Sequence, residues 1–164
     1  MATIRPFKGF RPTPELCSKV AALPYDVMTS KEAREMVKND PYSFLHVDRA
    51  EIDLPENVDI YSKEVYEKAA SNLNKMIEDK VLIQDSKPVF YIYSLTMNGR
   101  EQIGLVVCTS IDEYLNNTIK KHEFTRADKE QDRINHVDYC NANTGPIFLT
   151  YKNQKTIDQI ISKE

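Results

Sequence analysis

The chain has 164 residues and a mass of 19.0 kDa, which is enough for one domain with its own hydrophobic core. Hydrophobic residues make up 41% of the sequence and charged residues 29%, so the composition is that of a folded protein and excludes a disordered one. The formal net charge of -3 excludes a global positive field that would draw the protein onto nucleic acid or an anionic membrane.

The cysteine pattern and the N-terminus bear on location. Cys17, Cys108 and Cys140 form no CxxC or similar pair, which is typical of a reducing compartment. The N-terminal MATIRPFKGF does not resemble a signal peptide, and no window approaches 18 uninterrupted apolar residues. We therefore expect a cytoplasmic protein with no membrane partner.

The N-terminal quarter is predicted to be irregular at first and then helical. Prolines recur through residues 4–24, which indicates an extended or irregular segment. Residues 23–27 are then expected to form a short strand or loop that presents Tyr25 and Asp26. Thr29 with Glu32 three residues later is a capping-box pattern, which predicts a helix over 30–38.

Four further segments are predicted up to residue 109. The run YSFLHV, residues 42–47, is interpreted as a strand. Apolar residues at helical spacing then predict an amphipathic helix over 62–79. Two β-rich runs joined by Asn98-Gly99 predict a hairpin over about 88–109, because Asn-Gly favours positive φ at both central positions of a type I′ turn.

The C-terminal part adds a strand expected over 147–151 and a helix expected over 156–163. Strands in hairpin pairing, mixed with helices of unequal length, favour an α+β fold with a small mixed or antiparallel sheet packed by several helices. We expect residues 1–164 to form a single domain.

The segment 119–143 is dense in charged side chains and poor in apolar ones, which makes it the first candidate for chemistry. If Thr125 caps a helix, helical spacing places Arg126, Lys129, Arg133 and His136 near one stripe. His122 and Glu123 then lie just before the electropositive helix start. Arginines and free N–H groups there suit a phosphate.

Acid–base and metal chemistry are both open to these residues. His122 can move a proton near neutral pH, and Glu123 or Asp132 can act as a base or as an oxygen ligand of Mg²⁺. The alternative is a solvated helix face without function. A structural zinc site is disfavoured because HExxH is absent, and no metal ligand set is assigned. The chain also has no GxxxxGK[ST], GxGxxG or GxSxG motif.

Several stretches together resemble one family. They are IRPFKGFRP, AALPYDVMTSKEAREMV, NDPYSFLHVDRAEIDLPE, IKKHEFTRADKEQDRINHVDY and TGPIFLTY. The chain resembles the uncharacterised bacterial and archaeal family labelled SpoOJ/ParA/ParB/RepB-like, a domain of unknown function. The resemblance implies that the chain is the N-terminal portion of a protein of about 400 residues. An ADGHHR-type motif, similar to that of ParB-fold free-serine kinases, is absent here because no two histidines are adjacent.

The resemblance also implies a function and a set of site residues. It implies phosphate transfer to or from serine, as in a phosphoserine phosphatase or a free-serine kinase. We expect His122 and Glu123 to be catalytic. The residues expected to contact phosphate or substrate are Tyr25, Asp26, Thr125, Arg126, Asp132 and Arg133.

The implied ligands are a small phosphorylated substrate and, in the full-length protein, Mg²⁺ or a nucleotide. The other implied partner is the protein's own C-terminal region. Two alternatives stay open: a ParB-like regulatory or nucleic-acid-binding module, and a non-catalytic interaction domain that completes a downstream site. Nucleic acid is not an expected partner, because the net charge is negative and no helix-turn-helix is recognisable.

Overall fold

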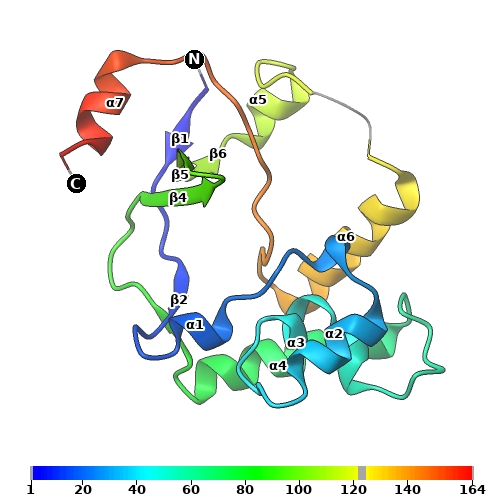
Figure 1. Cartoon of the computed structure of the whole chain (residues 1–164). Coiled ribbons are helices and arrows are strands. Elements are labelled where there is room, and N and C mark those ends of the chain that lie inside the picture. The colour runs from blue at the N-terminus through cyan, green and yellow to red at the C-terminus, as the bar shows by residue number, and fades with distance from the viewer. Residues whose placement is uncertain (1, 122–124, 164) are drawn as a thin grey trace. The chain divides into compact units, whose positions relative to one another are not determined.

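The computed structural model describes residues 2–121 and 125–163 and has the mixed α+β fold that the sequence predicts, with small antiparallel sheets and a hairpin. Its elements fall into two compact units, which we describe separately. The helical unit comprises the described residues of 9–85 and 123–144, and the hairpin unit comprises those of 2–8, 86–122 and 145–163. Figure 1 labels the α-helices and most of the strands.

The helical unit holds most of the helices and one short two-stranded sheet, in which β2 pairs antiparallel with β3. Its elements are β2 (Phe10–Pro12), α1 (Cys17–Val20), the 3-10 helix η1 (Tyr25–Val27), α2 (Ser30–Val37), α3 (Leu45–Asp48), the 3-10 helix η2 (Ala50–Asp53), α4 (Lys63–Glu78), β3 (Leu82–Gln84) and α6 (Ala127–Cys140).

Local signals place α2 and α4 where the sequence predicted them. The Thr29 side chain accepts from the Glu32 backbone N–H while the Glu32 side chain accepts from the Thr29 backbone, so the capping box is complete. Helix α4 begins after Ser62 and buries one apolar face, which includes Ala69 and Leu73. Both helix predictions are confirmed.

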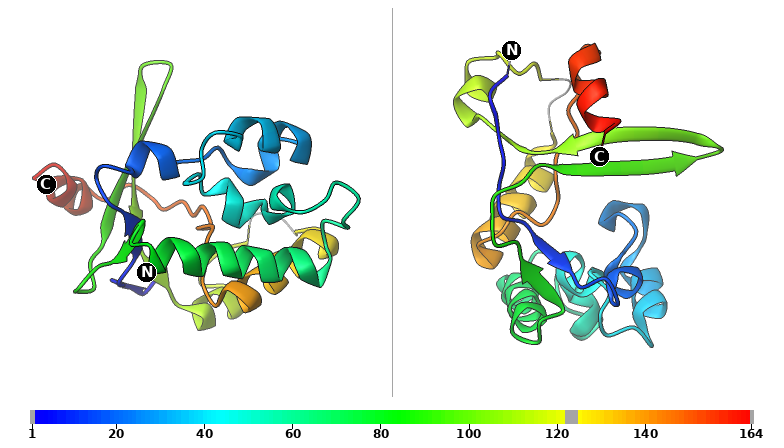
Figure 2. Two further views of the ribbon diagram at one scale, coloured as in Figure 1. Left: turned by 90° about the horizontal axis from the view of Figure 1, so that it is seen from below. Right: turned by 90° about the vertical axis from the view of Figure 1, so that its left-hand side faces the viewer.

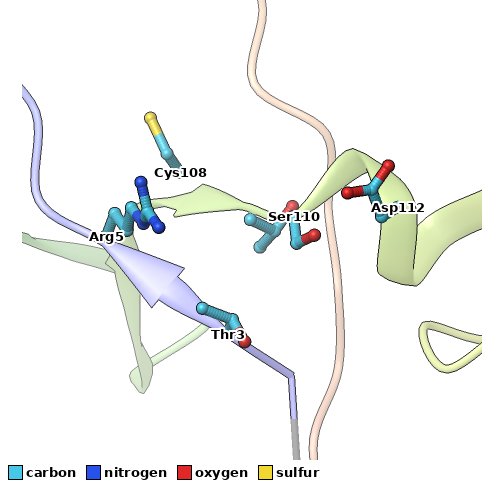
Figure 3. A pocket seen from close by; sticks show the side chains of 6 residues that line it. Thr3, Arg5, Cys108, Ser110 and Asp112 are labelled. Carbon is cyan, nitrogen blue, oxygen red and sulfur yellow. The ribbon is translucent and has the colours of Figure 1, made fainter.

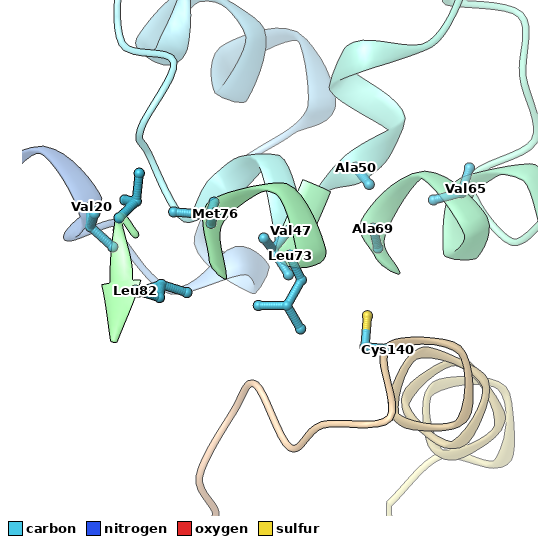
Figure 4. Packing of buried hydrophobic residues seen from close by; sticks show 10 residues of the cluster. Val20, Val47, Ala50, Val65, Ala69, Leu73, Met76, Leu82 and Cys140 are labelled. Atoms are coloured by element: carbon cyan, nitrogen blue, oxygen red, sulfur yellow. The ribbon is translucent and has the colours of Figure 1, made fainter. Parts of the chain in front are cut away.

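The main core lies in the helical unit and forms around α4. Side chains of α4 meet Val47 of α3, Ala50 of η2 and Cys140 at the end of α6 (Figure 4). Burial, together with the nearby Asp48 carboxylate, raises the pKa of the Cys140 thiol to about 11, so this cysteine behaves as a neutral core side chain.

The strand predicted for 42–47 is wrong, because this segment enters helix α3. Leu45 and Val47 are 2% and 0% exposed, so a single helical turn buries both. Asn72 of α4 donates to the backbone oxygen of His46 at 2.6 Å. Packing on α4 has therefore overridden the β propensity of YSFLHV.

The hairpin unit contains the predicted hairpin. Strand β4 (Tyr91–Met97) pairs with β5 (Arg100–Val106), and the two strands lie side by side in Figure 2. Asn98 and Gly99 have φ of 52° and 75°, so the predicted positive φ at both turn positions is confirmed. The remaining elements are β1 (Ile4–Arg5), β6 (Cys108–Thr109), α5 (Ile111–Leu115) and α7 (Lys155–Ile161).

Of the two predictions for the C-terminal part, one is confirmed and the other is wrong. The helix expected over 156–163 is present as α7. The strand expected over 147–151 is wrong, because residues 147–151 have no regular secondary structure. Ile147 and Phe148 are 71% and 77% exposed, so this apolar run has no sheet face to pack against among the described residues.

Candidate functional site

A small pocket of about 60 Å³ lies inside the helical unit. It is lined by η1, the α3–η2 segment, the residues before α4, α4 itself and α6. The lining residues are Tyr25, Val47, Asp48, Arg49, Ala50, Glu51, Ile60, Tyr61, Val65, Tyr66, Ala69, Lys129, Asp132, Arg133 and His136. Four of them, Lys129, Asp132, Arg133 and His136, come from one face of α6, as 3.6 residues per turn requires.

Arg133 is a cation that two neighbouring side chains orient in the pocket. Its guanidinium carbon lies 4.4 Å from the centre of the Tyr25 ring, a cation–π distance. Its Nε and Nη2 donate to Asp132 Oδ2 at 3.2 and 2.8 Å. The side chain is still 33% exposed, so a ligand in the pocket can reach the oriented guanidinium.

Asp132 also receives a hydrogen bond from α4. The Tyr66 hydroxyl donates to Asp132 Oδ1 at 2.9 Å, so both carboxylate oxygens have donors. Burial, together with the negative charge of Asp132, raises the pKa of Tyr66 and keeps the hydroxyl protonated. Asp132 is therefore a fixed support for Arg133 more than a free base.

Arg49 has a structural role at the pocket wall. Its Nη1 donates to the Tyr25 carbonyl at 3.2 Å and its Nη2 to Ser30 Oγ at 2.9 Å. Its Nε lies 2.9 Å from Glu51 Oε1 as an ion pair, although the angle is too poor for a hydrogen bond. These contacts connect η1, α2 and η2 and hold Tyr25 in place.

His136 and Asp48 form the inner wall. The His136 Nε2 lies 3.0 Å from the Val47 carbonyl, and a carbonyl can only accept, so Nε2 carries a proton. The Asp48 Oδ1 is buried and has no hydrogen-bond partner among the described residues. Burial raises the pKa of Asp48, while a hydrogen bond with Thr144 and the charges of His136 and Arg133 act in the opposite direction.

Lys129 stands at the other end of the α6 face. Its Nζ donates to the Tyr61 hydroxyl at 2.7 Å and lies 5.2 Å from the centre of the same ring. The bond to Tyr61 raises the pKa of Lys129, so the ammonium is charged at neutral pH.

The structure brings some of the predicted site residues together and leaves others apart. Tyr25, Asp132 and Arg133 line the pocket. Asp26 is exposed and is not part of the pocket lining. His122 and Glu123 lie outside the described residues, so their proposed catalytic roles stay predictions.

The start of α6 differs from the prediction. Thr125 is not the N-cap residue: α6 begins at Ala127, Arg126 is at the N-cap position, and the Arg126 side chain makes no capping hydrogen bond. The Arg126 side chain is 77% exposed and binds Asp128 at 2.8 Å, because that carboxylate lies within its own first turn. Arg126 therefore does not share the pocket with Arg133.

Sequence reasoning missed several pocket residues. Asp48 and Arg49 follow the segment that was predicted to be a strand and that in fact enters α3, and the sequence gives no site signal for Tyr61 or Tyr66. Tyr66 belongs to the periodic face of α4, where an aromatic residue is more often core than site. The one usable signal was the sequence DRAE, residues 48–51, a dense charged run just after an apolar one.

A second hollow, of about 440 Å³, lies in the hairpin unit. It is lined by β1, β6 and the start of α5 through Thr3, Arg5, Cys108, Thr109, Ser110 and Asp112 (Figure 3). Ser110 Oγ accepts from the Glu113 backbone at 3.4 Å, and Thr3 Oγ1 donates to the Glu113 carboxylate at 2.7 Å. These hydroxyl groups are engaged in holding α5, so we assign the hollow no chemistry.

The described residues contain neither a metal-binding cluster nor a membrane-spanning helix. No group of three His, Cys, Asp or Glu side chains is placed to hold a metal ion within residues 2–121 and 125–163. Across the same residues, no helix combines the length and apolar character needed to cross a membrane.

The fold and the pocket together define a mixed α+β protein with a small, charged and tyrosine-rich pocket. Residues 4–164 match the family described as "Protein of unknown function (DUF1015)", and the chain belongs to that family. The match supports membership of an uncharacterised family and gives no support to the SpoOJ/ParA/ParB/RepB part of the expected resemblance. No curated protein and no solved structure matches the chain.

Proposed function

We propose that the helical unit is a phosphate-handling part of an enzyme that acts on serine or phosphoserine, as a phosphatase or a free-serine kinase. The observation that carries the proposal is the Arg133 guanidinium, stacked on Tyr25 and held by Asp132 in the pocket. An arginine that is already oriented loses little entropy when it binds phosphoryl oxygens, and its planar fork suits them.

Lys129 supplies the second positive charge. It lies one turn before Arg133 on α6, and its ammonium has a tyrosine hydroxyl as its hydrogen-bond partner. A phosphate dianion held between Lys129 and Arg133 gains two charge-assisted interactions. His122 and Glu123 remain the proposed acid–base residues, and Mg²⁺ or a nucleotide in a longer protein remain proposed cofactors.

The test is an activity assay with two substrates. Phosphate release from phosphoserine and phosphorylation of serine by ATP or ADP are measured for residues 1–164 and for any longer natural form. Arg133→Ala is expected to lower the observed activity about 100-fold, because it removes a charge-assisted contact to the phosphate. Arg100→Ala, at the exposed first residue of β5 in the hairpin unit, is the matched control and is expected to keep activity.

Arg126→Ala tests whether the phosphate binds in the pocket or at the start of α6. If loss of Arg126 lowers activity as much as loss of Arg133 does, the phosphate binds at the beginning of α6 and not in the pocket. If Arg133→Ala keeps full activity, the pocket does not handle phosphate. Activity only in a longer form would favour an interaction domain that completes a downstream site. A cytoplasmic location also stays a prediction.

A further inference from the structure

Some charged side chains of the pocket form ion pairs with one another and others do not. The lining contains three carboxylates and three permanent cations. Glu51 lies 2.9 Å from Arg49 and Asp132 lies 2.8 Å from Arg133, so four of the six charges are already in ion pairs. Asp48 and Lys129 form no ion pair with any residue that the structure describes. One negative and one positive group are therefore left for a ligand.

Asp48 is the more unusual of the two, because a buried carboxylate oxygen normally has a donor. Its Oδ1 is shielded from solvent and has no partner among the described residues, while Thr144 bonds the carboxylate. Leaving such an acceptor unsatisfied is costly. The terminal torsion of an aspartate is broad, so the carboxylate can turn an oxygen toward a donor that enters the pocket.

The two unpaired charges lie at opposite ends of the pocket along α6. Asp48 lies beside His136, since the His136 Nε2 bonds the adjacent carbonyl of Val47. His136 comes seven positions after Lys129, which is about 10 Å along a helix. Arg133 lies between them, so a phosphate bound by Arg133 and Lys129 leaves the inner end of the pocket to another ligand group.

We infer that Asp48 binds the ammonium group of the ligand and so selects phosphorylated amines over phosphorylated alcohols and acids. The inference rests on the proposed function, because the phosphate of the same molecule would bind to Arg133 and Lys129. A zwitterionic ligand gives both charges a partner of opposite sign, whereas a plain phosphate ester leaves Asp48 Oδ1 without a donor among the described residues. Asp48 is then a specificity-determining residue of the pocket.

The experiment compares two ligands that differ at one position. Isothermal titration calorimetry of residues 1–164 near pH 7.5 measures O-phosphoserine, which has an ammonium group, and 3-phosphoglycerate, which has a hydroxyl group there. The wild-type chain should bind phosphoserine about 10- to 100-fold more tightly, as expected for a hydrogen bond between charged groups. Asp48→Asn should remove the preference and leave the affinity for 3-phosphoglycerate within about twofold.

Matched variants exclude a general loss of structure. Asp138→Asn makes the same change at an exposed position of α6 and should keep both affinities. Asparagine cannot ionise, so Asp48→Asn should melt at or above the wild-type temperature. If it fails to fold, the wild-type comparison of the two ligands decides alone.

The outcomes separate this inference from the function that it builds on. Equal wild-type affinities for phosphoserine and 3-phosphoglycerate, both weakened by Lys129→Gln, would overturn the role of Asp48 and leave the phosphate site in place. Absence of binding by either phosphate ester would overturn the proposed function of this chain together with the inference.

Discussion

At the scale of single residues, His46 is held by two acceptors. Its Nδ1 lies 2.9 Å from Asp53 Oδ1 and its Nε2 lies 3.1 Å from the Asp40 carbonyl. Only an imidazolium donates from both nitrogens, so the site favours the protonated ring. The bond to Asp53 raises the pKa of His46, and burial acts against that rise. Burial acts to raise the pKa of Asp53, but the hydrogen bonds from His46 and Asn72 outweigh it, and the pKa is lowered.

These shifts predict a pH-dependent stability. Because the folded pKa of His46 is raised, its contribution is fully present below the unfolded pKa of about 6.5 and is lost as the pH rises through the folded value. Because the pKa of Asp53 is lowered, its contribution is present above about pH 3.9 and is lost as the pH falls through the folded value. The pair should therefore stabilise the fold most strongly between about pH 4 and pH 6.5.

The measurement is urea unfolding of the wild type and His46→Gln near pH 5.5 and pH 8. From pH 5.5 to pH 8, the free energy of unfolding of the wild type should fall by about 1 kcal/mol more than that of the variant. The expected difference is modest because the side chains of His46 and Asp53 are both partly exposed to solvent. Glutamine does not titrate, so the pH dependence that remains in the variant comes from the other titrating groups, including the other two histidines. Equal losses in the two proteins would show that the pair does not couple protonation to folding.

At the scale of elements, the sequence could predict those whose signals are local. The capping box of α2, the periodic face of α4 and the Asn98-Gly99 turn are each complete within a few residues, and all three form as expected. Helix α3 could not be predicted, because its conformation depends on packing against α4 and on the bond from Asn72.

In the candidate site too, the sequence predicts what depends on local spacing and does not predict contacts with distant segments. Helical spacing along α6 predicts that Lys129, Arg133 and His136 share a face, and that face does line the pocket. The partners of these side chains come from η1, α3 and α4, which no spacing within α6 can indicate. Arg126 lies outside the pocket lining, and Asp128 two residues later binds its guanidinium.

The contact between α4 and its neighbours can be tested at Ala69. This residue is 0% exposed and belongs to the same cluster as Val47 and Cys140, so there is no room for a larger side chain. Ala69→Leu should lower the free energy of unfolding by about 1–3 kcal/mol through overpacking. Ala127→Leu, at the exposed first residue of α6, is the control and should change stability by less than about 0.5 kcal/mol. A stability of Ala69→Leu equal to that of the wild type would mean that the helices can separate freely.

At the scale of the whole molecule, exposed apolar side chains gather in the hairpin unit. Tyr93, Leu95 and Met97 of β4 are 55%, 55% and 75% exposed, and β4 pairs with β5 alone among the described strands. Strand β4 has no charged residue. A long, uncharged and apolar edge strand is a template for pairing with another chain.

We therefore expect residues 1–164 to associate reversibly as the protein concentration rises. Thr96→Lys should shift sedimentation toward the monomer, because it adds a charge to the edge and is opposite Glu101 in the ladder. Thr96→Val, which keeps the shape without the charge, should not have this effect. A wild-type chain that stays monomeric across the concentration series would show that the edge is protected.

The balance of charges in the pocket also has a consequence for how fast a ligand arrives. Three carboxylates and three permanent cations face one small space, so their fields largely cancel a few ångströms outside it. Electrostatic attraction would therefore do little to steer an anion toward the pocket, and the anion would be recognised only when it contacts the lining residues. Association rates measured by stopped flow should then change little with ionic strength, and tight binding would reflect slow dissociation.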